Sequence, residues 1–196
     1  MDEIEIVDGV PLLNDRLRAA HIPHAFGGAI AYGRYGIPRG TNDWDVNIFL
    51  PETAAEAVFD ALRPLAIEPT AEQRAELSKS GQVRLDWGGK KLDLFFAYAE
   101  FHKSAEARVR ESDFEGESIF VLSAEDIIVF KILFDRAHDW RDIERIFHRM
   151  GDRIELDYVN HWLTAMLGAE DSRIQHLAGV VEKARELMAE GTDSES

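Results

Sequence analysis

Residues 26–50 constrain the fold of this chain more than any other part of its sequence. A short apolar run leads into Gly27 and Gly28, a segment of small residues follows, and a second apolar run begins at Asp43 and Asp45. This order predicts a strand, a tight turn into a helix, and a further strand that carries two aspartates. Because residues i and i+2 of a strand point to the same face, the two carboxylates should lie side by side.

Two adjacent carboxylates repel each other unless a cation lies between them, and Mg²⁺ prefers oxygen ligands of this kind. Gly27 and Gly28 fall at the expected start of the helix, where free backbone N–H groups and the helix dipole favour phosphate. A phosphate-binding turn beside a pair of carboxylates indicates a site for a metal–nucleotide complex. The alternative is an ordinary turn beside two aspartates at a solvated sheet edge.

The order of these residues resembles the core motif of the nucleotidyltransferase superfamily, and the sequence from Arg39 through Thr41 to Asp45 is most similar to AbiEii/AbiGii-type toxin nucleotidyltransferases. One departure is Gly28, because many members carry a serine there. The resemblance covers about residues 24–145. It implies an α+β (α/β) fold of the polymerase-β-like type, with a mixed sheet flanked by helices and a helical region after it.

Residues 82–97 contain two alternating runs around a Gly-Gly pair, which is typical of a β-hairpin with a two-residue turn. In that register Arg84 faces Asp93. The resemblance implies a third metal-binding carboxylate on the second strand of the hairpin, and Asp93 matches it. Asp86 is the second candidate for this carboxylate. The alternative for Asp93 is a cross-strand ion pair with Arg84.

Residues 123–134 predict a helix that is buried on most sides and contains one cation, Lys131. A lysine in an apolar core requires an anionic partner. The resemblance implies that Lys131 contacts the triphosphate, and that Asp139 and Asp142 belong to a later motif that closes the site. The alternatives are a lysine that extends along the helix surface and Asp139 as the N-cap of a helix over residues 140–150.

The chain has 196 residues, of which 45% are hydrophobic, and no cysteine, so we expect a folded protein without disulfides or thiolate metal sites. The formal net charge of −15 disfavours an extended nucleic-acid-binding face. No run reaches membrane-spanning length, and the acidic N-terminus differs from a basic secretory segment. We therefore expect a cytoplasmic protein that does not bind membranes.

The character of the sequence changes near Leu122, with strands and helices before it and helices only after it. This change predicts a nucleotidyltransferase core in residues 1–121 and a C-terminal helical region in residues 122–190. The polar segment 191–196 is expected to be a disordered tail.

The resemblance implies an enzyme that uses Mg²⁺, or Mn²⁺ in its place, to move an NMP group from an NTP to a hydroxyl acceptor. The acceptor is open between tRNA, a protein and a small molecule, and a toxin would have an antitoxin partner. A non-catalytic nucleotide-binding or partner-binding module of the same fold is the alternative. The residues expected to bind metal are Asp43, Asp45 and Asp93; these three and Lys131 are expected to be catalytic; and those expected to bind nucleotide are Gly27, Gly28, Arg39, Thr41, Lys131 and Asp142.

Overall fold

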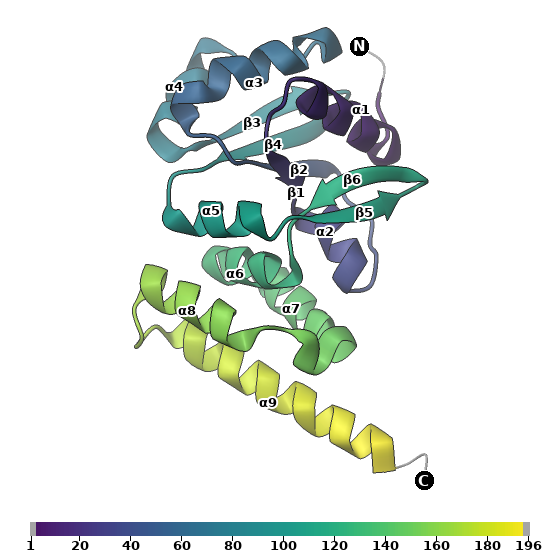
Figure 1. The fold of residues 1–196 in the computed structure, drawn as a ribbon, viewed down its shortest axis with the longest axis vertical. Coiled ribbons are helices and arrows are strands. Elements are labelled where there is room, and N and C mark those ends of the chain that lie inside the picture. Colours follow the sequence, from purple (N-terminus) through teal and green to yellow (C-terminus); the bar gives the residue numbers. More distant parts are fainter. Residues whose placement is uncertain (1–2, 194–196) are drawn as a thin grey trace. The chain divides into compact units, whose positions relative to one another are not determined.

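The computed structural model of the protein describes residues 3–193, which form two compact units (Figure 1). The first unit contains the chain up to Ala31 and from Arg39 to Ser123, and the second contains residues 32–38 and the chain from Ala124 onward. Helix α2 (Gly28–Tyr35) therefore begins in the first unit and ends in the second.

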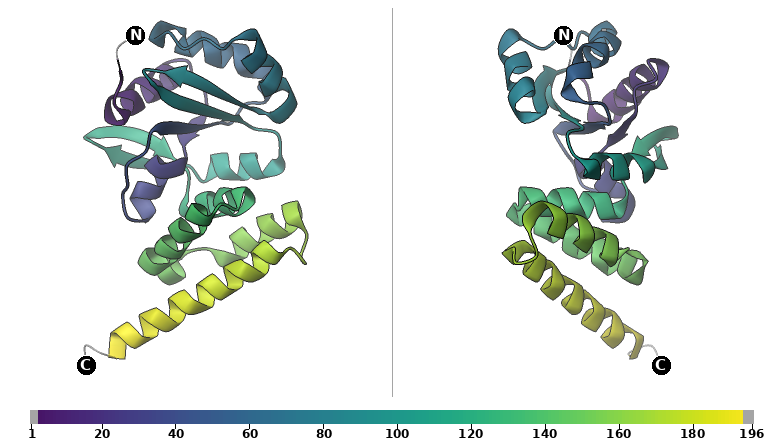
Figure 2. Two further views of the ribbon diagram at one scale, coloured as in Figure 1. Left: turned by 180° about the vertical axis from the view of Figure 1, so that it is seen from behind. Right: turned by 60° about the vertical axis from the view of Figure 1, so that its left-hand side comes forward.

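The first unit is built on a six-stranded mixed sheet with the strand order β3-β4-β2-β1-β6-β5. Neighbours β1 and β2 are antiparallel, whereas β2 and β4 are parallel, as are β1 and β6. The antiparallel hairpin of β5 and β6 extends beyond the other strands (Figure 2). The strands are β1 (His24–Phe26), β2 (Asp43–Ile48), β3 (Gln82–Trp87), β4 (Lys90–Phe96), β5 (Arg110–Phe114) and β6 (Glu117–Val121).

One face of the sheet carries the core of the first unit. Trp44 and Val46 alternate with the two aspartates of β2 and are fully buried. The indole ring of Trp44 lies 4.7 Å from that of Trp87, and its Nε1 donates a hydrogen bond to the carbonyl of Ile6 at 3.2 Å. The helices of this unit, apart from α2, are α1 (Ile6–Ala19), α3 (Ala55–Leu62), α4 (Ala71–Ser80) and α5 (Glu100–Ala107), with short 3₁₀ turns at Glu52–Ala54 and Arg63–Leu65.

All elements in the described part of the second unit are helical. Helices α7 and α9 are joined by an aromatic contact, in which the ring of Trp140 stacks on that of His176 at 3.9 Å. Helix α9 continues through residues 191–193 of the segment expected to be a tail, and residues 194–196 lie outside the described residues. The helices after α2 are α6 (Ala124–Phe134), α7 (Ala137–Met150), α8 (Leu156–Leu167) and α9 (Ser172–Asp193), with a 3₁₀ turn at Gly151–Arg153.

No helix within residues 3–193 combines the length and the apolar character that crossing a membrane requires.

Candidate active site

The two aspartates of β2 lie on the face of the sheet opposite the tryptophan core. Asp43 and Asp45 are both half-buried, and the residue between them is fully buried on the other side. Strands β2 and β4 pair in parallel with Asp45 beside Asp93. Residues paired across neighbouring strands point to the same face of a sheet. The structure therefore brings the three carboxylates that the sequence singled out onto one face of the first unit.

The glycine turn is in direct contact with this carboxylate group. The N–H of Gly27 donates a hydrogen bond to the carbonyl of Asp45 at 2.8 Å. Gly28 has a positive φ of 49°, and a Cβ atom at this position would lie 1.8 Å from Oδ2 of Asp45. Only a residue without a side chain fits there.

Arg84 forms a bidentate ion pair with the third carboxylate. Its Nε donates to Oδ1 of Asp93 at 2.7 Å, and its Nη2 donates to Oδ2 at 2.6 Å. Asp93 is buried, with 7% of its surface exposed, whereas the side chain of Arg84 is 63% exposed. The cross-strand pair given as an alternative for Asp93 is therefore present, in the register that the hairpin pattern predicts.

The guanidinium group of Arg84 lies in the electrostatic field of all three aspartates. Its pKa is raised above the ordinary value, mainly by the hydrogen bonds and the charge of Asp93, and further by the charges of Asp43 and Asp45. Asp86, the second candidate, instead forms an exposed ion pair with Lys91. A permanent cation is thus part of the carboxylate group.

The oxygen ligands of this group suit Mg²⁺ or Mn²⁺ in chemical type. Asp43 and Asp45 offer carboxylates from one strand, and Thr41 donates its hydroxyl to Oδ1 of Asp43, which orients that carboxylate. Asp93 does not fit a metal as it stands, because Arg84 occupies both of its oxygens. In agreement, the residues that the structure describes contain no cluster of three His, Cys, Asp or Glu side chains arranged to hold a metal ion.

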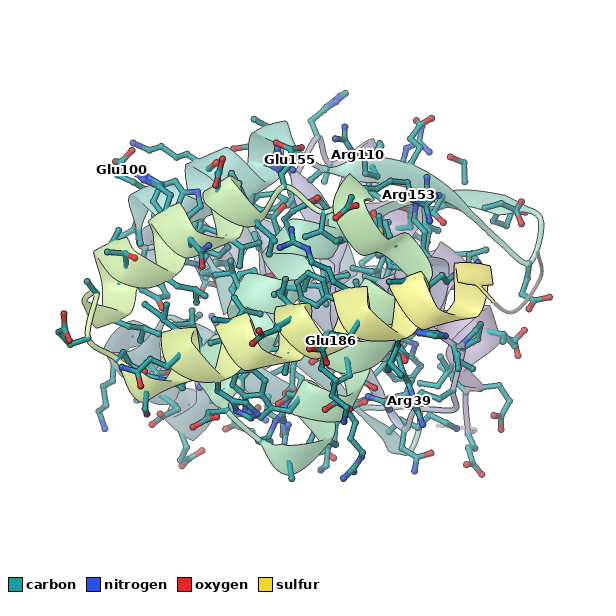
Figure 3. All side chains as sticks on the ribbon, turned by 90° about the horizontal axis from the view of Figure 1, so that it is seen from below. Arg39, Glu100, Arg110, Arg153, Glu155 and Glu186 are labelled. Carbon is teal, nitrogen blue, oxygen red and sulfur yellow. The ribbon has the colours of Figure 1, made fainter. Side chains whose placement is uncertain are left out.

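The loop between α2 and β2 carries two further residues of the predicted site. Thr41 is half-buried beside Asp43, as described above. Arg39 is exposed, and its Nη1 donates to the carbonyl of Gly40 at 3.4 Å (Figure 3). The position of Arg39 next to the carboxylate strand is compatible with phosphate binding, which stays a prediction.

Lys131 lies in the second unit, where its side chain is buried between two aspartates of α7. Its Nζ donates to Oδ1 of Asp139 at 3.0 Å and to Oδ2 of Asp142 at 2.7 Å. The lysine is 6% exposed, so it does not extend along the helix surface. The anionic partners that a buried lysine requires are therefore its two α7 aspartates. Nucleotide binding by Lys131 and Asp142 stays a prediction.

The alternative in which Asp139 is the N-cap of a helix over residues 140–150 is wrong. Helix α7 begins at Ala137 with Arg136 at the N-cap, so Asp139 is inside the first turn. Burial alone would raise the pKa of its carboxyl group, but hydrogen bonds from Arg136 and Lys131 hold that pKa below its ordinary value. Asp139 is therefore an ionised member of a buried network.

Asn47 is a further residue of the site that the motif reading missed. It follows Asp45 by two positions on β2, is buried, and has its Nδ2 atom 2.8 Å from where a Cβ atom of Gly27 would lie. The period of two along β2 already placed it on the face of the aspartates. Asn47 thus lies close to the glycine turn, on the face of the sheet that carries the aspartates.

No protein-family model matches the sequence, and no curated protein is significantly similar to it. Solved structures do match. The antibiotic-resistance factor ANT(2'')-Ia has a TM-score of 0.59 at 14% identity, with 87% of this chain and 97% of that chain covered. A crystal structure of ANT(2'')-Ia in complex with adenylyl-2''-tobramycin matches with the same TM-score, covering 81% of this chain.

Two further structures resemble the chain. An antigenic nucleotidyltransferase-like protein from Paracoccidioides brasiliensis has a TM-score of 0.51 at 18% identity and covers 91% of this chain and 92% of its own. The lincosamide antibiotic adenylyltransferase LnuA, with lincomycin bound, has a TM-score of 0.50 at 13% identity and covers 74% of this chain and 98% of its own. The chain therefore has the α+β fold of nucleotidyltransferases, as its sequence predicts.

Proposed function

We propose that the protein is a nucleotidyltransferase that moves an NMP group from an NTP to a hydroxyl group. The observation that carries this proposal is the contact between Gly28, at the start of α2, and Asp45, which lies beside Asp93 in the sheet. This contact joins a helix N-terminus suited to phosphate to a set of carboxylates suited to a divalent cation. The likeness of the fold to known nucleotidyltransferases supports the same reading.

The residues of the first unit would bind and orient the NTP. Because the N–H of Gly27 already bonds to the carbonyl of Asp45, the backbone N–H of Gly28 would hold phosphate oxygens, and Arg39 would add a positive charge. Asp43 and Asp45 would hold Mg²⁺ or Mn²⁺, and Asp93 would serve as third ligand only after Arg84 has released it. When bound, such an ion neutralises charge on the triphosphate and on the leaving group.

The reaction itself exchanges one P–O bond for another. The oxygen of the acceptor hydroxyl forms a bond to the α-phosphorus in line with the bond to the β-phosphate, which breaks, and pyrophosphate leaves. The acceptor proton passes to water, or to Asp93 when that carboxylate is held by neither Arg84 nor the metal ion. Because the transferred group needs little covalent help, the protein contributes mainly by positioning and by charge neutralisation.

We propose a small molecule as the acceptor. The chain spans 97% and 98% of the lengths of ANT(2'')-Ia and LnuA, whose structures were solved with antibiotics or an adenylylated antibiotic. A net charge of −15 repels a polyanion such as tRNA and attracts a cation. A small hydroxyl compound that carries amino groups is therefore the acceptor class we favour over RNA or protein.

The toxin assignment and its antitoxin partner rest on the local resemblance around residues 39–45 alone. They would leave the chemistry unchanged. A non-catalytic nucleotide-binding module is the second candidate function, and the ion pair between Arg84 and Asp93 favours it, because that pair removes one carboxylate from metal binding.

The test of the proposal is the transfer of label from α-labelled ATP, CTP, GTP and UTP in the presence of Mg²⁺. The acceptors offered would be a set of amino-group-bearing hydroxyl compounds, tRNA and the protein itself. We expect label on a small molecule with the wild type and none with Asp45→Asn. Binding of Mg-NTP without transfer to any acceptor would favour the non-catalytic module, and the absence of both would refute the nucleotide site.

A further inference from the structure

The ion pair between Arg84 and Asp93 differs from an ordinary surface pair in its surroundings. Asp93 lies on β4, an inner strand of the sheet, with the edge strand β3 on one side and β2 on the other. Its carboxylate is buried and accepts two hydrogen bonds from one planar guanidinium group. Fork-like pairing of this kind is among the stronger hydrogen-bonded contacts in proteins. Exposed pairs contribute much less.

The neighbours of Asp93 explain why a cation is needed there. Asp45 is paired with it across β2 and β4, and Asp43 lies two residues further along the same face. Like charges at this spacing raise the free energy of the ionised group unless a cation compensates them. Lys91, which is paired with Asp43 across the strands, bonds instead to Asp86.

The same positive charge is an obstacle to a metal ion. A divalent cation that used Asp93 as a ligand would meet a guanidinium group on both carboxylate oxygens. The guanidinium group of Arg84 is able to move away from Asp93, because most of the Arg84 side chain is exposed and Arg84 lies on the edge strand β3. A released guanidinium group would return to water at little desolvation cost.

We propose that Arg84 is a built-in counter-cation that competes with the divalent metal ion for Asp93. In the metal-free protein Arg84 bonds to the carboxylate of Asp93 and stabilises the cluster of Asp43, Asp45 and Asp93. Binding of the metal ion displaces the guanidinium group from Asp93. This inference rests on the proposed function, since it concerns the metal site of that function, and Arg84 acts here as a positioning residue.

The consequence is a measurable penalty on metal affinity. Removing Arg84 should free Asp93 and tighten the binding of Mn²⁺ about tenfold, as the loss of a competing charge-assisted pair predicts. Arg84→Lys keeps the charge but not the fork, so its affinity should fall between those of the wild type and Arg84→Gln. A through-space effect of the lost charge would persist when Asp93 is replaced by Asn, whereas competition for Asp93 would not.

The experiment is a calorimetric titration of the full chain with Mn²⁺ in the absence of nucleotide. The variants are Arg84→Gln, Arg84→Lys, Asp93→Asn and the double variant Arg84→Gln/Asp93→Asn. A matched control is Arg63→Gln, because Arg63 is also an exposed arginine in an ion pair of the first unit, with Asp60 three residues before it.

We expect tighter Mn²⁺ binding in Arg84→Gln, no comparable gain in Arg63→Gln, and no gain from removing Arg84 in the Asp93→Asn background. Equal or weaker binding by both Arg84 variants would overturn the proposal, and so would the same gain in the Asp93→Asn background. If Arg84→Gln does not fold, Arg84→Lys decides alone by the direction of its change. If only the competition by Arg84 is wrong, the wild type still transfers label. If the proposed function is wrong, the wild type transfers no label.

Discussion

At the scale of single residues, the site depends on Gly28 more than its sequence suggests. The alternation of Asp43 and Asp45 along β2 was predictable, because the period of a strand is a local property. The pairing of Arg84 with Asp93 was also predictable, because a two-residue turn fixes the hairpin register. The contact between Gly28 and Asp45 was not, since it depends on how the start of α2 packs against β2.

Gly28→Ala should impair both folding and catalysis. The positive φ alone costs an alanine about 1–2 kcal/mol, and the new methyl group would displace the carboxylate of Asp45. Because misplacement of a catalytic group by about 1 Å can cost about a hundredfold in rate, we expect at least that loss of transfer activity. The measurements are urea unfolding and steady-state transfer rates.

A matched control is Gly179→Ala in α9, where a Cβ atom would have no neighbour within 4 Å. This change should raise stability slightly, by about 0.5–1 kcal/mol, and leave transfer activity unchanged. If Gly28→Ala were as well tolerated as Gly179→Ala, the steric account of the glycine turn would be wrong.

At the scale of elements, helices α6 and α7 are held together by a buried ionic network. The sequence indicated that Lys131 needs an anionic partner, and Asp139 and Asp142 supply the charges. Which aspartates would reach it could not be derived, because the start of α7 was expected at residue 140 instead of Ala137. With the N-cap at Arg136, Asp139 lies inside the first turn of α7, where its side chain reaches Lys131.

Lys131→Met should destabilise the protein by about 3–5 kcal/mol, because two buried carboxylates would lose a shared cation. Urea unfolding followed by circular dichroism measures this loss. Lys103→Met is the control, since Lys103 forms an exposed pair with Glu100 and should contribute less than about 1 kcal/mol. Similar effects of the two changes would contradict the buried network.

The lowered pKa of Asp139 gives the network a defined pH dependence. Its folded-state pKa lies below the ordinary value of 3.8, so the stabilisation is complete above that value and is lost as the pH falls through the folded-state pKa. The difference in unfolding free energy between the wild type and Asp139→Asn should therefore shrink on acidification below about pH 4. Unfolding curves at a series of pH values test this, and a constant difference down to about pH 2 would refute it.

At the scale of the whole molecule, the sequence predicts a division of the chain and the sign of its charge. The division into a mixed-sheet unit and a helical unit follows from the patterns of hydrophobic residues before and after Leu122. Those patterns did not predict that residues 32–38 belong to the helical unit, because this assignment depends on tertiary contacts of the second half of α2. The net charge of −15 follows from the sequence alone, and its electrostatic effect acts at long range.

If the acceptor is cationic, its KM should rise with ionic strength, because salt screens the attraction to an acidic protein. We expect an increase of several-fold between about 50 mM and about 500 mM salt, with a much smaller change in kcat. Steady-state kinetics with a neutral hydroxyl compound as comparison would check this. A salt-independent KM for the cationic acceptor would remove charge as a reason for the proposed acceptor class.

In the proposed reaction the α-phosphorus of an NTP moves to a hydroxyl group at the carboxylates of β2. The most direct test compares α-labelled with γ-labelled NTP in the same transfer reaction, using the wild type, Asp45→Asn and the exposed control Asp60→Asn. We predict an acceptor labelled only from α-labelled NTP, by the wild type and Asp60→Asn but not by Asp45→Asn. Label from the γ-position would show that a different group is transferred, and transfer that survives in Asp45→Asn would show that the reaction does not depend on this carboxylate.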